Sequence, residues 1–341
     1  MLSTGAAPTS RGWQPIEWQG AAAPVEVWFP RRVLPPRPAL RSRWAEAVRR
    51  GYACAVAAPA REGLIDSRDW VQRYLALLGV ERRPPDAAAL AELTRAHILS
   101  VPFENVTSLL RRLAYPGAVP PVDADELLAR WERRGAGGVC FEIADLFGRL
   151  LAALGYRVHP VLGHITFPGS HQALVVRVGD ASLLVDVGNG APFFEPIPLR
   201  EAVEVRRAGL AYRFRPNAGG VEWVQERWIE EKWTPFCRYE LHPADPLTRA
   251  AAYQRHHVPG ETWVTGSLTL IRCFAEEVLL LRDEELSRFT GSGKRTDRIA
   301  TLADYSRVTA EVFGLPELPI ADGVRAWRDN VAKAGLPTRQ R

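Results

Sequence analysis

The spacing of apolar residues changes character near the middle of the chain. Up to about residue 156 they recur every three or four positions, which is the period of an amphipathic helix. The clearest run is "FEIADLFGRLLAALGY", in which Ile143, Phe147, Leu150 and Leu154 share one face and Gly155 supplies a C-terminal stop. Weaker runs of the same period predict helices from Ser67, after a capping Asp86, in "VPFENVTSLLRRL" and in "DADELLARWERR".

After Gly155 the chain changes to short β-branched runs, which are typical of strands. These runs are "YRVHPVLGHI", "QALVVRV", "SLLVDV", "AYRFRP", "VEWVQERWIEEKW", "GSLTLIRCF" and "EVLLLRD". A closing helix is predicted from Ile299 to Val312, with Gly314 ending it. Helices followed by strands indicate an α+β fold.

The first 66 residues are rich in Ala, Pro and Arg and have no sustained periodicity. "VEVWF" could form a short strand and "SRWAEAVRRGYA" a short helix, while "VLPPRPALRSR" resembles an extended linker. The sequence does not decide whether this segment is ordered.

Composition narrows the class of protein. With 47% hydrophobic and 24% charged residues, the 341-residue chain is globular. A net charge of +5 suits an anionic ligand, but no basic run is interleaved with aromatics, so we expect no nucleic-acid partner. Residues 1–20 lack the apolar core of a secretory signal, and "RRGYACAVAAPA" at 49–60 resembles one but lies too far along the chain. No apolar run reaches membrane-spanning length, so we expect a cytoplasmic protein without a membrane partner.

Cys140 is distinguished from the other three cysteines by its local sequence. Cys54, Cys237 and Cys273 are scattered without C-x-x-C spacing, so neither a metal site nor a disulfide framework is expected. Cys140 instead sits where the glycine-rich "GAGGV" becomes a helix. Unpaired N–H groups and the helix dipole there favour an anion, and the thiolate is the nucleophilic form of cysteine. The alternative is a small buried apolar residue.

A cysteine nucleophile needs a base and a group that orients the base. His171 opens the strand "HQALVVRV", and Asp186 lies in the next, otherwise apolar strand, where an unpaired carboxylate would be costly. With a two-residue turn at 179–180, position 173 faces Asp186, and His171 becomes its diagonal neighbour on the same face. The alternative is a purely structural His–Asp pair.

The remaining candidates carry weaker signals. His159 and His164 fall in the preceding strand, and His242, His256 and His257 lie in loop-like text that predicts solvated side chains. "TGSGKRT" at 290–296 lacks the full phosphate-loop pattern and is interpreted as a surface loop.

Three local motifs resemble those of the arylamine N-acetyltransferase family. "AGGVCFE" resembles the family's R-G-G-x-C-x-E, Pro102 to Asn105 its P-F-E-N, and "VDVGNG" its V-D-V-G-F-G. The resemblance covers about residues 67 to 325 and marks the chain as a divergent member.

The resemblance implies a papain-like fold: an N-terminal helical bundle, a central antiparallel β-barrel and a C-terminal α/β lid. The corresponding divisions are an extension of unknown order at 1–66, the bundle carrying the cysteine at 67–156, the barrel carrying His and Asp at 157–255, and the lid with the C-terminal helix at 256–341.

The resemblance also implies a reaction. An acetyl group would pass from acetyl-CoA, or another acyl thioester, through Cys140 to an aromatic amine in a ping-pong cycle, with His171 relaying the proton and Asp186 orienting His171. Backbone N–H groups at the Cys140 turn would stabilise the oxyanion. The residues expected to line the substrate site are Phe103, Val139, Gly188 and Asn189. No bound cofactor or metal is implied, because the thioester is a co-substrate.

Departures from the family pattern weaken the case for a flat arylamine. Ala136, Val139, Ala144 and Asn189 stand where the family usually has Arg, an aromatic residue, Asn and Phe. Loss of an aromatic wall favours, as an alternative, an amide synthase of natural-product assembly that takes an acyl chain from CoA or an acyl carrier protein. A papain-like hydrolase and an inert binding protein are further alternatives.

Overall fold

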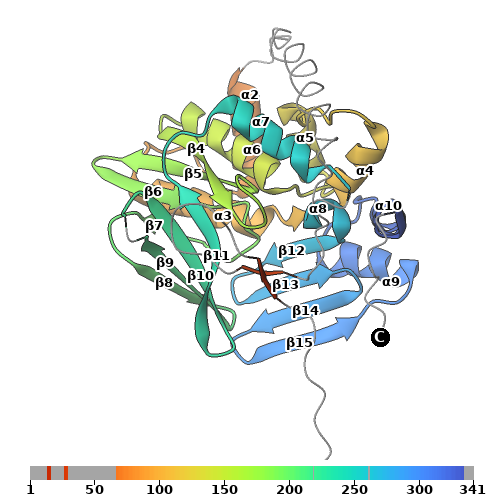
Figure 1. The fold of residues 1–341 in the computed structure, drawn as a ribbon. Coiled ribbons are helices and arrows are strands. Elements are labelled where there is room, and N and C mark those ends of the chain that lie inside the picture. The colour runs from red at the N-terminus through yellow and green to blue at the C-terminus, as the bar shows by residue number, and fades with distance from the viewer. Residues whose placement is uncertain (1–13, 17–26, 30–66, 218, 260–261, 334–341) are drawn as a thin grey trace, which may run out of the picture.

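The computed structural model describes residues 14–16, 27–29, 67–217, 219–259 and 262–333. Within them the chain forms a group of helices, a large antiparallel sheet and a smaller antiparallel sheet covered by helices (Figure 1). These three parts follow one another in sequence, apart from one short strand.

The first part contains five helices, which begin close to where the apolar periodicity predicts. They are α2 (Ser67–Leu78), α3 (Ala87–Ser100), α4 (Val106–Ala114), α5 (Ala124–Glu132) and α6 (Cys140–Ala153). Asp86 caps α3 as predicted, because its Oδ1 accepts the Ala89 N–H at 2.7 Å. The helix predicted across "VPFENVTSLLRRL" is wrong at its start, where Phe103–Glu104 form strand β3 and pair with the distant strand β12.

The central sheet has eight antiparallel strands. They are β4 (Arg157–His164), β5 (His171–Val178), β6 (Ala181–Val185), β7 (Ile197–Pro198), β8 (Val203–Arg207), β9 (Leu210–Pro216), β10 (Glu222–Ile229) and β11 (Lys232–Glu240). The spatial order β7-β6-β5-β4-β11-β10-β9-β8 brings the second half of the sheet beside the first through the β4–β11 contact. The sheet curls into an incomplete barrel, since its end strands β7 and β8 are not paired with each other.

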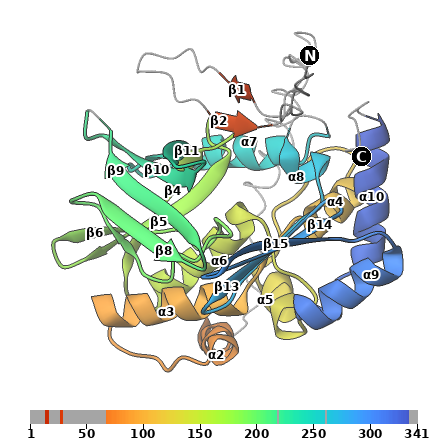
Figure 2. The ribbon, with the colours of Figure 1, turned by 90° about the horizontal axis from the view of Figure 1, so that it is seen from below.

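The third part is the lid, built on strands β12 (Thr269–Cys273), β13 (Glu277–Arg282), β14 (Glu285–Thr290) and β15 (Gly293–Arg298), with β3 at the edge. Helices α7 (Pro246–His256) and α8 (Trp263–Gly266) precede this sheet; α9 (Leu302–Arg307), a π-helical turn at Val308–Val312 and α10 (Ile320–Lys333) follow it. Figure 2 shows α9 and α10 at the edge of the lid that faces away from the barrel. The predicted surface loop at 290–296 is exposed but belongs largely to a strand, β15.

Near the N-terminus, β1 (Gln14–Ile16) and β2 (Val27–Phe29) form an antiparallel pair, which confirms a strand in "VEVWF". The helix predicted in "SRWAEAVRRGYA" lies outside the described residues.

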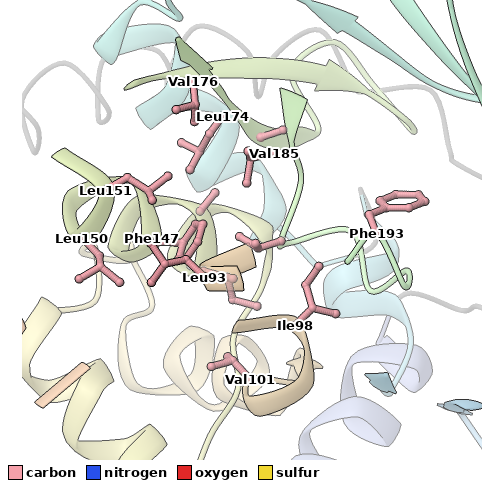
Figure 3. Packing of buried hydrophobic residues seen from close by; sticks show 14 of the residues in the cluster. Leu93, Ile98, Val101, Phe147, Leu150, Leu151, Leu174, Val176, Val185 and Phe193 are labelled. Atoms are coloured by element: carbon pink, nitrogen blue, oxygen red, sulfur yellow. The ribbon is translucent and has the colours of Figure 1, made fainter. Parts of the chain in front are cut away.

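Helix α6 is fixed by its packing against the central sheet. Phe147, Leu150 and Leu151 are fully buried, as the periodicity predicts, and Leu151 points toward Leu174 and Val176 of β5 (Figure 3). Burial of each such side chain contributes about 1.5–3 kcal/mol to stability. This contact holds the first turn of α6 in a fixed position relative to the barrel strands.

The expected fold class is therefore confirmed: an α+β fold with a helical bundle, a barrel-like antiparallel sheet and an α/β lid. Among the described residues, no helix combines the length and apolar character that crossing a bilayer requires.

Candidate active site

Cys140 is the first residue of α6 and is 5% exposed. Its turn is held by Glu142, whose carboxylate accepts the Val139 N–H at 3.1 Å and the Tyr253 hydroxyl at 2.9 Å. Burial raises the pKa of Glu142, while these two hydrogen bonds lower it. Glu142 thus links the start of α6 to helix α7 and holds the turn that carries Cys140 in place.

The loop after β6 packs directly on the backbone of Cys140. At Gly188, a Cβ atom would lie 2.7 Å from the Cys140 Cα and 2.9 Å from its Cβ. Only glycine permits this approach. The contact brings the end of β6, and with it Asp186, next to the first turn of α6.

The β5–β6 hairpin has the predicted register. Val178 pairs with Ala181 and Leu174 with Val185, so His171 and Asp186 come together beyond the last pair. His171 Nε2 lies 2.9 and 2.8 Å from the two carboxylate oxygens of Asp186, and both residues are 2% exposed. Cys140 is a side-chain hydrogen-bond partner of the same imidazole. Because Nε2 is engaged by the carboxylate, Nδ1 is the nitrogen left for the thiol.

Electrostatics favour a charged imidazole in this cluster. Burial lowers the pKa of His171, but the Asp186 carboxylate and Cys140, through charge and hydrogen bonds, outweigh burial and raise it from 6.5 to about 10. The arrangement can therefore keep a protonated imidazole beside the Cys140 sulfur.

Asp186 has further partners that the sequence did not indicate. The Tyr239 hydroxyl donates to its Oδ2 at 2.7 Å, and the Asn189 amide donates to the same oxygen at 2.9 Å. Gln225 Oε1 lies 2.8 Å from the Tyr239 hydroxyl and accepts from Asn189 Nδ2 at 3.1 Å. Tyr239 and Gln225 come from β11 and β10, which meet the His–Asp hairpin only through the β4–β11 pairing.

The four residues expected to line the substrate site fall into two groups. Phe103 and Val139 join an apolar cluster with Val264, and the partly buried Trp263 and Ile271 pack against it. Gly188 contacts Cys140, and Asn189 contacts Asp186, as described above. The apolar cluster therefore combines the bundle with α8 and the lid, whereas the 188–189 loop belongs to the barrel.

The prediction that His256 and His257 are solvated is wrong. They are 2% and 1% exposed, and the His256 ring packs against Phe141 and Phe167 with centroids 5.3 and 5.2 Å away. Burial lowers the pKa of His256 to about 3 and that of His257 to about 4. Both end helix α7, which packs against the start of α6, and this packing buries them. His242 is exposed, as predicted.

One cluster of described residues, His164, Glu222 and Glu240, has the composition of a metal site. The polar atoms of these three side chains are paired with other protein groups. The Gly169 N–H donates to His164 Nδ1 at 2.9 Å, so Nε2 carries the proton and donates to Glu240 at 2.8 Å. Arg238 pairs with Glu222 at 3.1 Å. The cluster is an ion-pair network on the outside of the β4–β11 junction.

The α+β fold, with a cysteine at a helix start and a His–Asp pair on adjoining strands, places the chain in the papain-like superfamily. Comparison with known proteins specifies the family: residues 86–319 match the family model described as N-acetyltransferase. The chain belongs to the arylamine N-acetyltransferase family, as a divergent member, and it is an acyltransferase.

Individual relatives support this assignment. The arylamine N-acetyltransferase of Mycolicibacterium smegmatis is 30% identical over 210 residues, covering 57% of this chain and 73% of the relative. The proansamycin X synthase of Amycolatopsis mediterranei is 29% identical over 182 residues, covering 51% and 68%. The structure of the Mycobacterium abscessus arylamine N-acetyltransferase matches with a TM-score of 0.65 at 26% identity, covering 77% of this chain and 94% of that one.

Proposed function

We propose that this protein transfers an acyl group from an acyl thioester, by family default acetyl-CoA, to an amine through an acyl-Cys140 intermediate in a ping-pong cycle. The observation that carries the proposal is the buried cluster in which His171 contacts both Cys140 and Asp186. Family membership supports the reaction class, and the cluster supports the route.

In the first half-reaction, the Cys140 thiolate attacks the thioester carbonyl carbon. A new carbon–sulfur bond forms, the bond to the donor sulfur breaks, and the departing thiolate takes the proton held by His171. Backbone N–H groups at the start of α6 can stabilise the oxyanion. In the second half-reaction, the amine attacks acyl-Cys140, His171 accepts its proton, and the Cys140 thiolate leaves. Asp186 orients the imidazole and stabilises its charged form throughout.

The test is intact-protein mass spectrometry after incubation with acetyl-CoA and no amine. We expect the mass to rise by one acetyl group, located on Cys140 by peptide mapping, and to return to its starting value when an amine is added. Cys140→Ala should show no adduct. Cys237→Ala is the matched control, because Cys237 is also a free buried thiol in the barrel and should not affect labelling. An adduct on Cys237, or none on the wild type with any thioester, would refute the route.

The second candidate is amide formation with a longer acyl chain delivered by CoA or an acyl carrier protein. Asn189 favours it, because a polar amide occupies the position of the family's aromatic wall. The likeness to a proansamycin X synthase points in the same direction. Competition between acetyl and long-chain thioesters for Cys140, read from the adduct masses, separates the two candidates.

A further inference from the structure

Strand β10 presents two polar side chains, Gln225 and Arg227, on the face that points into the barrel. The β9–β10 register is regular there: Gln225 pairs with Phe214, and Arg227 pairs with Tyr212, whose ring is also buried inside. Two residues along a strand span about 7 Å. Arg227 therefore lies one inward position beyond Gln225, which contacts the partners of Asp186.

Gln225 has a buried donor without a partner. Its Oε1 accepts a hydrogen bond at 3.1 Å from Asn189 Nδ2, which also donates to Asp186. Nε2 consequently points away from the Asp186 network. Gln225 is 0% exposed, and Nε2 makes no hydrogen bond. A buried unsatisfied donor costs about 1–3 kcal/mol.

Arg227 is a cation without an anionic partner among the described residues. Its guanidinium carbon lies 3.2 Å from the Phe236 ring centroid and 5.9 Å from that of Tyr212, and its Nε is buried without a hydrogen bond. The adjacent Glu226 does not serve it, because that carboxylate pairs with Arg213 and Arg215 on the other face. Burial lowers the pKa of Arg227.

The charge of this guanidinium is felt by groups of the catalytic cluster and of the lid. Tyr239, which donates to Asp186, and Cys237 both interact with it electrostatically. Arg282, from strand β13 of the lid, adds a second positive charge near it. The Nε–H of Arg227 and the Gln225 amide donor remain unsatisfied unless an acceptor joins them, and a negatively charged acceptor would also be attracted by the Arg227 guanidinium.

We propose that Arg227, with Gln225 Nε2 as a second donor, binds an anionic group of one of the two substrates, a carboxylate or a phosphate. The guanidinium, kept planar against Phe236, presents a fork of donors suited to either group. That the bound anion belongs to a substrate rests on the proposed acyl transfer, whereas the anion site itself does not depend on it.

The experiment measures binding to the full-length protein by isothermal titration calorimetry with two pairs of probes. p-Aminobenzoate and p-toluidine differ in one carboxylate, and CoA and N-acetylcysteamine differ in the phosphates. Arg227→Gln should weaken binding of one anionic probe by roughly tenfold to a hundredfold, the range for a charged hydrogen bond, and leave its neutral counterpart unchanged. The probe that loses affinity identifies which substrate carries the anion.

Two further variants complete the test. Arg206→Gln removes the same charge from an exposed side chain of β8 and should change no affinity. Arg227→Lys keeps the charge without the fork, so it should retain part of the affinity, and it replaces Arg227→Gln if that variant does not fold. Equal affinity of wild type and the Arg227 variants for both anionic probes, or no binding of either probe to the wild type, would overturn the proposal. If Cys140 accepts no acyl group yet the affinity difference persists, the proposed function fails and the anion site stands.

Discussion

Two hairpins meet at Asp186, and they differ in how completely their polar groups are satisfied. The β5–β6 hairpin brings His171 to Asp186, and the imidazole is engaged on one side by the carboxylate and on the other by Cys140. The β10–β11 hairpin brings Tyr239 to the same carboxylate but leaves donors on Gln225 and Arg227 without partners. A closed set of hydrogen bonds suits a catalytic group whose position must not vary. Hydrogen-bond donors without a protein partner are instead suited to bind a substrate, which associates and dissociates in each catalytic cycle.

The largest expected effect comes from Asp186→Asn at the β5–β6 hairpin, where His171 and Asp186 both have partners; we call this hairpin the closed side and the β10–β11 hairpin, with its unpaired donors, the open side. An amide keeps the shape but removes the charge that does most to raise the pKa of His171, and we expect kcat/KM to fall by about 10³- to 10⁴-fold. Iodoacetamide labelling of Cys140 against pH provides a second measurement. In the wild type, the labelling rate should change as the pH rises through about 10, where His171 loses its proton. In the variant, this change should occur at lower pH.

The same pKa has a consequence for stability with a definite sign. Because the pKa of folded His171 lies at about 10 and its ordinary value is 6.5, protonation stabilises the fold fully below pH 6.5. That contribution disappears as the pH rises through about 10. The measurement is the difference in the free energy of unfolding between the wild type and Asp186→Asn, followed from pH 6.5 to about 10. If this difference does not decrease as the pH rises, the assignment is contradicted.

The next effect comes from the junction between the hairpin and α6. In Gly188→Ala, the new Cβ would lie 2.7 Å from the Cys140 Cα, so the loop or the first turn of α6 must move. A displacement of about 1 Å at a reacting group costs about 10²-fold in rate, and we expect a loss of kcat of that order. Gly117→Ala is the control, because its Cβ would meet nothing within 4 Å. Equal activity of both variants would show that the 188 loop does not position Cys140.

The closed side was also the more predictable one from sequence. Periodicity located α6 and its N-terminal Cys140, and hairpin parity joined His171 to Asp186, because both signals act within a few residues of the groups concerned. Tyr239 was not predicted, since its contact with Asp186 depends on β11 pairing with β4 across a long sequence separation. The buried His256 was misjudged for a similar reason: the packing of α7 on α6 has no local signal in the sequence.

On the open side, Tyr239→Phe should have a smaller effect. It removes one charge-assisted hydrogen bond to Asp186, while the bonds from His171 and Asn189 remain, and we expect kcat/KM to fall by about tenfold. Tyr305→Phe is the matched control, because this fully buried tyrosine donates to the Asp283 carbonyl oxygen in the lid, far along the chain from the cluster. Both variants should lose similar stability in thermal unfolding, but only Tyr239→Phe should lose activity. An equal loss in both would reduce the role of Tyr239 to packing.

The smallest and most selective effect is expected from Asn189→Phe, which restores the aromatic residue usual in the family. The variant loses one of the donors to Asp186, so kcat should fall a few-fold, about threefold to tenfold. It also gains an aromatic face next to the loop that contacts Cys140, and this should lower KM for a neutral flat amine such as p-toluidine by a similar factor. Asn189→Ala separates the two consequences, because it loses the donor without adding the ring. If both variants changed KM equally, the aromatic wall would not determine the acceptor, and selectivity would have to come from the unsatisfied donors of β10.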